Sequence, residues 1–176
     1  EKNLLYYALF VSFFPQLVAG PIERSTNLLP QLRHVDRLHL WDTKRIQKGA
    51  VFMLYGYIMK MIIADRIAML VNTVFDPLSY QNYSGILAVI AAVLFSIQIY
   101  CDFAGYTYIA IGASKIMGIE LMNNFNMPYL AVNIKDFWDR WHISLSTWFR
   151  DYLYFPLGGS RRGQIRKYIN IFIVFV

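Results

Sequence analysis

The sequence predicts an all-α protein, a multi-pass transmembrane helical bundle with interfacial or re-entrant amphipathic helices. Two observations favour this class. Of the 176 residues, 57% are hydrophobic and only 16% are charged, whereas about 25% of the residues of a typical soluble domain are charged. The apolar residues also stand in long blocks, which is typical of helices that cross a membrane rather than of a soluble core.

Four apolar blocks define the expected helices. The first ends at the helix-breaking pair Gly20-Pro21, and the third is the cleanest, with Ser96 and Gln98 as its strongly polar side chains. The blocks cover residues 4–19, 49–64 with a continuation to 70, 85–101 with a continuation to 112, and 168–176. We expect the second and third blocks to cross the bilayer once each, because a crossing of about 30 Å needs about 20 helical residues.

The segments that connect these blocks differ in charge. Residues 21–48 and 160–167 are rich in Lys and Arg, whereas residues 71–84 contain Asp76 and no cation. If the second and third blocks each cross once, both basic segments lie on one side of the membrane, and the positive-inside rule identifies that side as the cytoplasm. Basic segments beside anionic membrane lipid explain the net charge of +6, so no nucleic-acid partner is expected.

Several familiar kinds of site are not expected. The single cysteine, Cys101, excludes an intrachain disulfide and a Cys-based zinc site, and we expect it to be a buried free thiol. His34 and His39 lie five residues apart, out of the register of a metal-binding helix face, so we expect solvated histidines and no metal. Residues 158–163 lack the Gly-Lys-Ser/Thr ending of a phosphate loop and are expected to form a turn.

Residues 137–152 hold a dense mixture of aromatic, charged and polar side chains. The apolar ones recur every three or four residues, as on one face of a helix; they are Trp138, Trp141, Leu145, Trp148, Phe149 and Tyr152. His142, Ser146 and Arg150 are four residues apart and would share a second face. Because Trp and Tyr favour the membrane–water boundary, we expect one amphipathic helix that lies at the interface and does not cross the bilayer.

His142 is the first candidate for chemistry. A histidine accepts or donates a proton near neutral pH, which suits general acid–base work on a hydroxyl. Asp139, three residues earlier, is placed to orient its ring, and Ser146 lies one turn later. The alternative is an interfacial histidine that only hydrogen-bonds a neighbour. The spacing leaves both interpretations open.

Asp102 is the second candidate. It follows the cleanest apolar block, and an ionisable group at membrane depth costs about 2.5–3.5 kcal/mol on insertion scales, so it normally faces protein, water or a pathway. The functional interpretation makes Asp102 line or brace a polar site. The structural alternative is an ion pair within the bundle, with Lys60 or Lys115 as partner. Both interpretations are again open.

Beyond these patterns, the order of motifs resembles a known family. Residues 137–159 closely resemble the signature of the membrane-bound O-acyltransferase family, in its alginate O-acetyltransferase-like bacterial branch. Three further segments resemble family motifs in the same order, namely residues 14–22, residues 100–106 with 109–112, and residues 124–129. The D-alanyl-transfer branch shares much of the Trp-His motif, but the ending Tyr-Leu-Tyr-Phe-Pro-Leu-Gly-Gly at 152–159 favours the alginate-like branch.

The resemblance implies a multi-pass enzyme of the bacterial cytoplasmic membrane. Such an enzyme moves an acyl group, here acetyl, from a thioester donor to hydroxyls of a cell-envelope or secreted polysaccharide. The donor, acetyl-CoA or an acyl-carrier protein, would be a substrate, with no cofactor bound. The implied partners are membrane lipid, the polysaccharide or an intermediate acyl acceptor, and a second, extracytoplasmic acyltransferase.

The resemblance also assigns roles to residues. His142 matches the histidine of the Trp-His motif and would be a supporting catalytic residue, whereas the principal catalytic histidine is expected beyond Val176. Asp102, Asp139, Ser146 and Arg150 are candidates for lining the site. Residues 1–176 would then be the central fragment of a single membrane O-acyltransferase domain, without its N-terminal helices and C-terminal catalytic region, and inactive alone. The competing classes are a transporter or channel-like component and a non-catalytic scaffold of an acylation complex.

Overall fold

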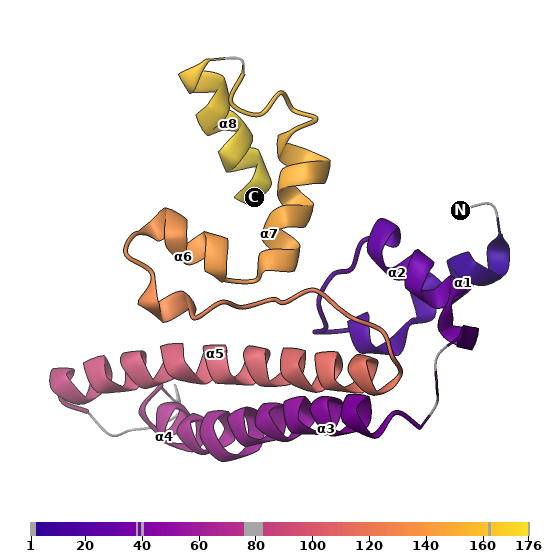
Figure 1. The fold of residues 1–176 in the computed structure, drawn as a ribbon. Coiled ribbons are helices and arrows are strands. Elements are labelled where there is room, and N and C mark those ends of the chain that lie inside the picture. Colours follow the sequence, from indigo (N-terminus) through magenta and orange to yellow (C-terminus); the bar gives the residue numbers. More distant parts are fainter. Residues whose placement is uncertain (1–2, 38, 40, 76–82, 162, 176) are drawn as a thin grey trace. The chain divides into compact units, whose positions relative to one another are not determined.

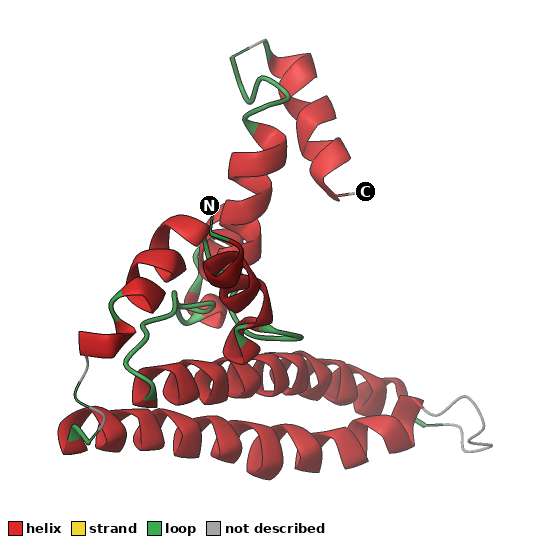
Figure 2. Ribbon diagram, turned by 90° about the vertical axis from the view of Figure 1, so that its right-hand side faces the viewer, coloured by secondary structure: helices red, strands yellow, loops and turns green. Residues whose placement is uncertain are grey.

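The computed structural model describes residues 3–37, 39, 41–75, 83–161 and 163–175, and within these ranges every regular element is helical (Figure 2). The predicted all-α class is therefore confirmed for the described residues. The chain divides into two compact units, residues 1–121 and residues 122–176.

A long helical hairpin dominates the first unit (Figures 1 and 2). Its first arm joins α3 (Thr43–Tyr57), the π-helical segment η3 (Ile58–Ala64) and α4 (Asp65–Phe75), and its second arm is α5 (Gly85–Ile116). Side chains fix the helix starts, because Asp42 accepts the backbone N–H of Arg45 at 3.1 Å and Ser84 accepts that of Leu87 at 3.4 Å.

Two pairs of glycines bring the arms of the hairpin into backbone contact. A Cβ atom added at Gly112 would lie 2.6 Å from the carbonyl oxygen of Gly49, and one added at Gly105 would lie 2.8 Å from that of Gly56. Both distances are too short for real carbon–oxygen contacts, so only glycine fits at these crossings. The pairing of 49 with 112 and of 56 with 105 makes the two arms antiparallel.

The N-terminal part of the first unit differs from the prediction. A helix running to Gly20-Pro21 is wrong, because α1 (Leu4–Ser12) ends earlier and a 3₁₀ turn, η1 (Phe14–Gln16), follows. Pro15 explains this end, since its ring would clash with the carbonyl four residues earlier in a continuing helix. Two further elements follow, α2 (Ser25–Arg33) and the 3₁₀ turn η2 (Val35–Arg37). An apolar core joins the end of α1, α2, α5 and the chain just after α5: Phe13, Leu28, Leu32, Ile111, Ile119 and Leu121.

Helix α5 is the one helix of the described residues that is long and apolar enough to cross a membrane. Its 32 residues extend over about 48 Å, more than the roughly 30 Å of a bilayer core. The other expected crossing, residues 49–70, is helical throughout but contains the π-helical segment and the charged residues Lys60, Asp65 and Arg66. In the connecting segment 71–84, α4 continues to Phe75, and residues 76–82 lie outside the described ranges.

The second unit consists of shorter helices. They are the 3₁₀ turn η4 (Pro128–Leu130), α6 (Ile134–Arg140), α7 (Ile143–Phe149), the π-helical segment η5 (Arg150–Tyr154) and α8 (Gln164–Phe175). The predicted single helix over 137–152 is wrong, because the chain breaks at Trp141 and His142. Before α8, residues 158–161 form a turn as predicted, whereas residue 162 of the predicted segment 158–163 lies outside the described residues. The buried Asn170 side chain donates to the carbonyl oxygen of Gly159 in this turn at 2.9 Å.

Candidate functional site

The turn between α6 and α7 is the centre of the candidate site. Helix α6 is short but stabilised by the Asn133 cap and by two ion pairs one turn apart, Lys135 with Asp139 and Arg140 with Asp136. It ends where Trp141 becomes extended (φ −103°, ψ 128°). His142 then takes a left-handed conformation with φ 43°, which costs a residue with a side chain about 1–3 kcal/mol and so must be held by its surroundings.

Hydrogen bonds to Asn124 stabilise the left-handed conformation of His142. Its backbone oxygen accepts the N–H of Ile143 at 2.9 Å, and its Oδ1 accepts the hydroxyl of Ser144 at 2.5 Å and the N–H of Ser144 at 3.3 Å. Both side chains are fully buried. On the other flank of the turn, Asn126 donates its backbone N–H to the oxygen of Arg140 at 3.0 Å. The segment 124–126 therefore fixes the backbone before and after His142.

Aromatic rings fix the other half of the turn. Trp141 packs edge-on against Phe125 with 5.1 Å between ring centroids, and it stacks on Phe137 at 5.5 Å. Tyr129 stacks on Phe137 at 6.3 Å. Aromatic pairs in such arrangements contribute about 0.5–1.5 kcal/mol beyond the area they bury. With Trp141 held in this cluster, the chain direction at His142 is set.

A groove of about 840 Å³ lies beside the turn. It receives Asp139 from α6, His142 from the turn, Ser146 from α7 and Arg150 from η5. Four of the five predicted site residues thus line one groove. Its remaining walls are mostly apolar and come from α6, α7, η5 and α8: Trp138, Trp141, Leu145, Phe149, Leu153, Tyr154, Ile171, Ile173, Val174 and Phe175.

The polar residues of the groove differ in their contacts. Asp139 binds Lys135 Nζ at 2.6 Å, so its expected role in orienting the His142 ring stays a prediction. Ser146 donates its hydroxyl to the carbonyl oxygen of Trp141 at 3.3 Å, and Arg150 Nε donates to Asp151 at 3.3 Å.

His142 itself is half-buried, and this burial lowers its pKa below the ordinary value of a histidine. A lowered pKa favours the neutral imidazole at neutral pH. That is the form that accepts a proton.

Asp102 lies on α5 in the first unit and has a clear structural partner. Lys60 Nζ lies 2.6 Å from its carboxylate and 2.9 Å from that of Asp65. The ion pair with Lys60 is therefore confirmed, whereas Lys115 pairs with Glu120 at 3.9 Å. The additional role of Asp102 in lining a polar tunnel stays a prediction. Cys101 beside it is a buried free cysteine, as predicted.

The predicted solvent exposure of the two remaining histidines is confirmed. His34 and His39 are both exposed, and Nδ1 of His34 lies 2.8 Å from the carbonyl oxygen of Pro30. Sequence reasoning did miss the roles of Asn124 and Ser144. The two residues lie 20 positions apart in the sequence, and a single buried asparagine gives no periodic signal, so only the fold brings this pair to light.

The chain is similar in sequence to known proteins. The sequence model described as MBOAT, membrane-bound O-acyltransferase family, matches residues 2–176. Among individual relatives, the chain is 41% identical over 174 residues to the "Probable alginate O-acetylase AlgI" of Pseudomonas aeruginosa, covering 99% of this chain and 32% of the relative.

Two relatives carry other printed names. The chain is 42% identical over 175 residues to the "Peptidoglycan O-acetyltransferase" of Helicobacter pylori, covering 99% of this chain and 33% of the relative. It is 37% identical over 160 residues to the "Teichoic acid D-alanyltransferase" of Bacillus subtilis, covering 86% of this chain and 37% of the relative. The chain thus spans about a third of the length of the relatives it matches.

Proposed function

This chain belongs to the membrane-bound O-acyltransferase family, and from that premise we propose that the whole protein transfers acetyl from a thioester donor to hydroxyls of a cell-envelope or secreted polysaccharide. The names of the relatives support this choice. Those named as alginate or peptidoglycan acetylating enzymes are 40–42% identical to the chain, and those named as teichoic acid D-alanyltransferases are 37% and 30% identical.

The single observation that carries the proposal is the groove beside the α6–α7 turn. A half-buried histidine with a lowered pKa stands there beside a hydroxyl and a cation, between apolar walls. In the proposed reaction, the principal histidine receives the proton of the acceptor hydroxyl as the hydroxyl oxygen attacks the thioester carbonyl carbon, and the neutral imidazole of His142 holds that hydroxyl or the principal ring in position. The carbon–sulfur bond then breaks, and the leaving thiolate takes up the proton from the imidazolium.

The proposal includes the wider setting of the enzyme. The whole protein is a multi-pass protein of the bacterial cytoplasmic membrane, and residues 1–176 are the central part of one O-acyltransferase domain. His142 supports a principal histidine that follows Val176 in the chain. The donor is acetyl-CoA or an acyl-carrier protein. The acceptor is the polysaccharide or an intermediate that passes acetyl to a second, extracytoplasmic acyltransferase.

Mass spectrometry of envelope polymers tests the proposal. Deletion of the full-length gene should remove ester-linked acetyl from a polymer, and the wild-type gene should restore it. His142→Ala should restore little of it, whereas the matched variant His34→Ala, at an exposed histidine outside the groove, should restore it fully. Membrane levels of the variants are compared by immunoblot. Unchanged polymer acetylation after deletion would exclude the proposal and favour a transport or scaffold role.

A further inference from the structure

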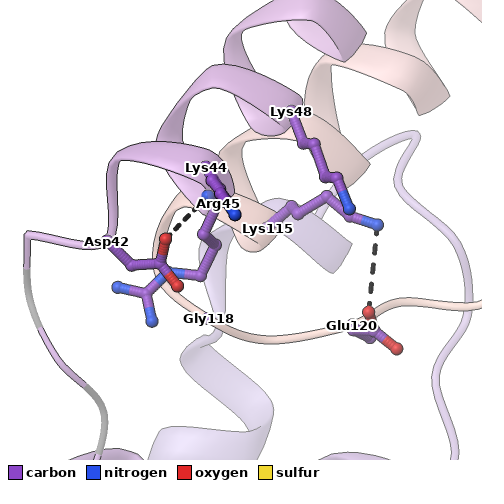
Figure 3. A pocket seen from close by; sticks show the side chains of 7 residues that line it. All are labelled: Asp42, Lys44, Arg45, Lys48, Lys115, Gly118 and Glu120. Atoms are coloured by element: carbon purple, nitrogen blue, oxygen red, sulfur yellow. Dashed lines mark hydrogen bonds and ion pairs between the residues drawn. The ribbon is translucent and has the colours of Figure 1, made fainter.

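A small cationic pocket lies in the first unit, where the N-terminal end of α3 meets the C-terminal end of α5 (Figure 3). Its volume is about 260 Å³. Four cations line it, three from α3 and one from α5, together with two acids and a glycine: Lys44, Arg45, Lys48, Lys115, Asp42, Glu120 and Gly118. Figure 3 shows the side chains of Lys48 and Lys115 extending toward one another.

The two acids do not neutralise this pocket. Asp42 accepts the backbone N–H of Arg45 as the cap of α3, and Glu120 lies 3.9 Å from Lys115, at the outer limit of an ion pair. Within the described part of the chain, neither Lys44 nor Lys48 has an acidic partner. The lining therefore carries two more positive than negative charges, beside the positive end of the α3 dipole.

The convergence of the cations is built into the packing. The contact of Gly49 with Gly112 brings the two helix backbones together one residue after Lys48 and three residues before Lys115. The Lys115 ammonium lies 5.2 Å from the centroid of the Phe52 ring. Like charges held together in this way repel one another unless an anion lies between them.

The chain that leaves α5 is fixed as well. Gly118 ends the helix with φ 82°, and the Gln31 side chain of α2 binds both backbone groups of Glu120. It accepts the N–H at 2.7 Å and donates to the carbonyl oxygen at 3.0 Å. The segment 118–120 that lines the pocket is therefore held in one conformation, so that a ligand can bind without large rearrangement.

We propose that this pocket binds phosphate esters, and specifically the phosphate groups of the acyl-thioester donor. Lysine ammonium groups bind phosphate well, and a dianion balances the two excess charges. The identity of the donor rests on the proposed function, since coenzyme A and the carrier-protein prosthetic group both carry acyl thioesters on phosphate esters. The pocket also includes residues of the segment 21–48, which the sequence predicts to lie on the cytoplasmic side of the membrane. Acyl-thioester donors are made on that side.

Calorimetry on the purified full-length protein in a neutral detergent tests this site. The probes are coenzyme A, 4′-phosphopantetheine and pantetheine, the last of which has no phosphate. The combined variant Lys48→Gln/Lys115→Gln should weaken coenzyme A binding at least tenfold and leave pantetheine binding unchanged. Lys48→Arg/Lys115→Arg should bind coenzyme A within a few fold of wild type. The control Arg166→Gln removes an exposed cation outside the pocket and should change nothing.

Two results would overturn the proposal. Equal coenzyme A binding by the wild type and the Gln variant would show that the pocket holds no donor phosphate. Loss of dihexanoyl-phosphatidylglycerol binding in the Gln variant, with coenzyme A binding intact, would assign the pocket to a lipid headgroup. Polymer acetylation reports separately on the proposed function. If the wild type acetylates the polymer but the Gln variant binds coenzyme A as the wild type does, only the phosphate-binding proposal is refuted. If donor binding depends on the phosphate groups but the wild type does not acetylate any polymer, only the proposed function is refuted.

Discussion

At the scale of single residues, His142 stands in a left-handed conformation that its neighbours maintain. Asn124→Ala would remove the amide oxygen that accepts the buried Ser144 hydroxyl, and losing one partner of a buried hydrogen bond typically costs about 1–3 kcal/mol. We expect a large loss of polymer acetylation in full-length Asn124→Ala, because the turn that positions His142 relaxes. The measurement is ester-linked acetyl per amount of membrane-inserted protein.

A matched pair of variants controls this experiment. Asn123→Ala changes an exposed neighbour and should keep wild-type activity, and Asn124→Asp retains an oxygen acceptor and should recover part of it. If Asn124→Ala is well inserted and fully active, the hydrogen bonds to Ile143 and Ser144 do not matter for the position of His142.

The titration of His142 gives a second prediction at this scale. Diethyl pyrocarbonate acylates only neutral imidazole, and burial lowers the pKa of His142. Its labelling should therefore persist to lower pH than that of N-acetylhistidine amide, whose pKa is about 6.5. Peptide mass spectrometry across a pH series measures the midpoint. A midpoint at or above the reference would mean that a charged partner outweighs burial at this ring.

The prediction that His142, Ser146 and Arg150 share one face agrees with the groove for a specific reason. The four-residue spacing of His142, Ser146 and Arg150 survives because α7 and η5 form a continuous helical run after the turn. Asp139 lies on α6, before the break at Trp141 and His142, and still lines the same groove. The helical periodicity of the sequence does not predict this. The break depends on Asn124, and a hydrogen bond across 20 residues is a tertiary interaction that overrides helical periodicity.

At the scale of elements, the glycine pairs of the α3–α5 hairpin make a sharp prediction. Gly112→Ala would place a methyl group 2.6 Å from both the Gly49 oxygen and the Met53 side chain, and overpacking of this kind typically costs about 1–3 kcal/mol. We expect a lower thermal unfolding midpoint for full-length Gly112→Ala in detergent, followed by fluorescence-detected size exclusion.

The control for this variant lies at the other end of the same helix. A Cβ at Gly85 meets nothing within 4 Å, so Gly85→Ala should leave the midpoint unchanged or raise it slightly. Equal midpoints for Gly112→Ala and wild type would mean that the helices can separate locally without loss of stability.

Helix boundaries show where element prediction fails. Hydropathy located α5 well, because its apolar block has no internal breaker. It overextended α1, since the apolar run continues past Pro15 although the helix does not. It also gave no sign of the π-helical segments at 58–64 and 150–154, because one extra residue in a turn leaves no hydropathy signal.

At the scale of the whole molecule, the charge pattern predicts the membrane topology. Cysteines introduced at Lys44, Ser84 and Ser160 in a Cys101→Ser background can be labelled with an impermeant maleimide on intact cells. We expect labelling of the Ser84 position alone, because the segments 21–48 and 160–167 carry the cations and 71–84 does not. Labelling of the Lys44 position from outside would reverse the predicted orientation.

The extent of the chain gives the last prediction. Residues 1–176 reconstituted in lipid should show no acyl transfer, because the resemblance assigns the principal histidine to a position beyond Val176. Release of thiol from acetyl-coenzyme A in the presence of polysaccharide measures this, with the full-length protein as the positive reference. Turnover by the fragment would mean that the groove around His142 contains a sufficient set of groups.

The α3–α5 hairpin also fixes the register of its two arms. Glycine meets glycine at two crossings seven residues apart, so sliding one arm by a single residue would drive a side chain into the opposing backbone. The same two crossings stand next to the Lys60–Asp102 pair and next to the Lys48–Lys115 end. Twelve residues of helix keep Lys48 and Lys60 about 18 Å apart along the arm. A molecule bound at the Lys48–Lys115 end is therefore held at a fixed distance along the arm from the Lys60–Asp102 ion pair.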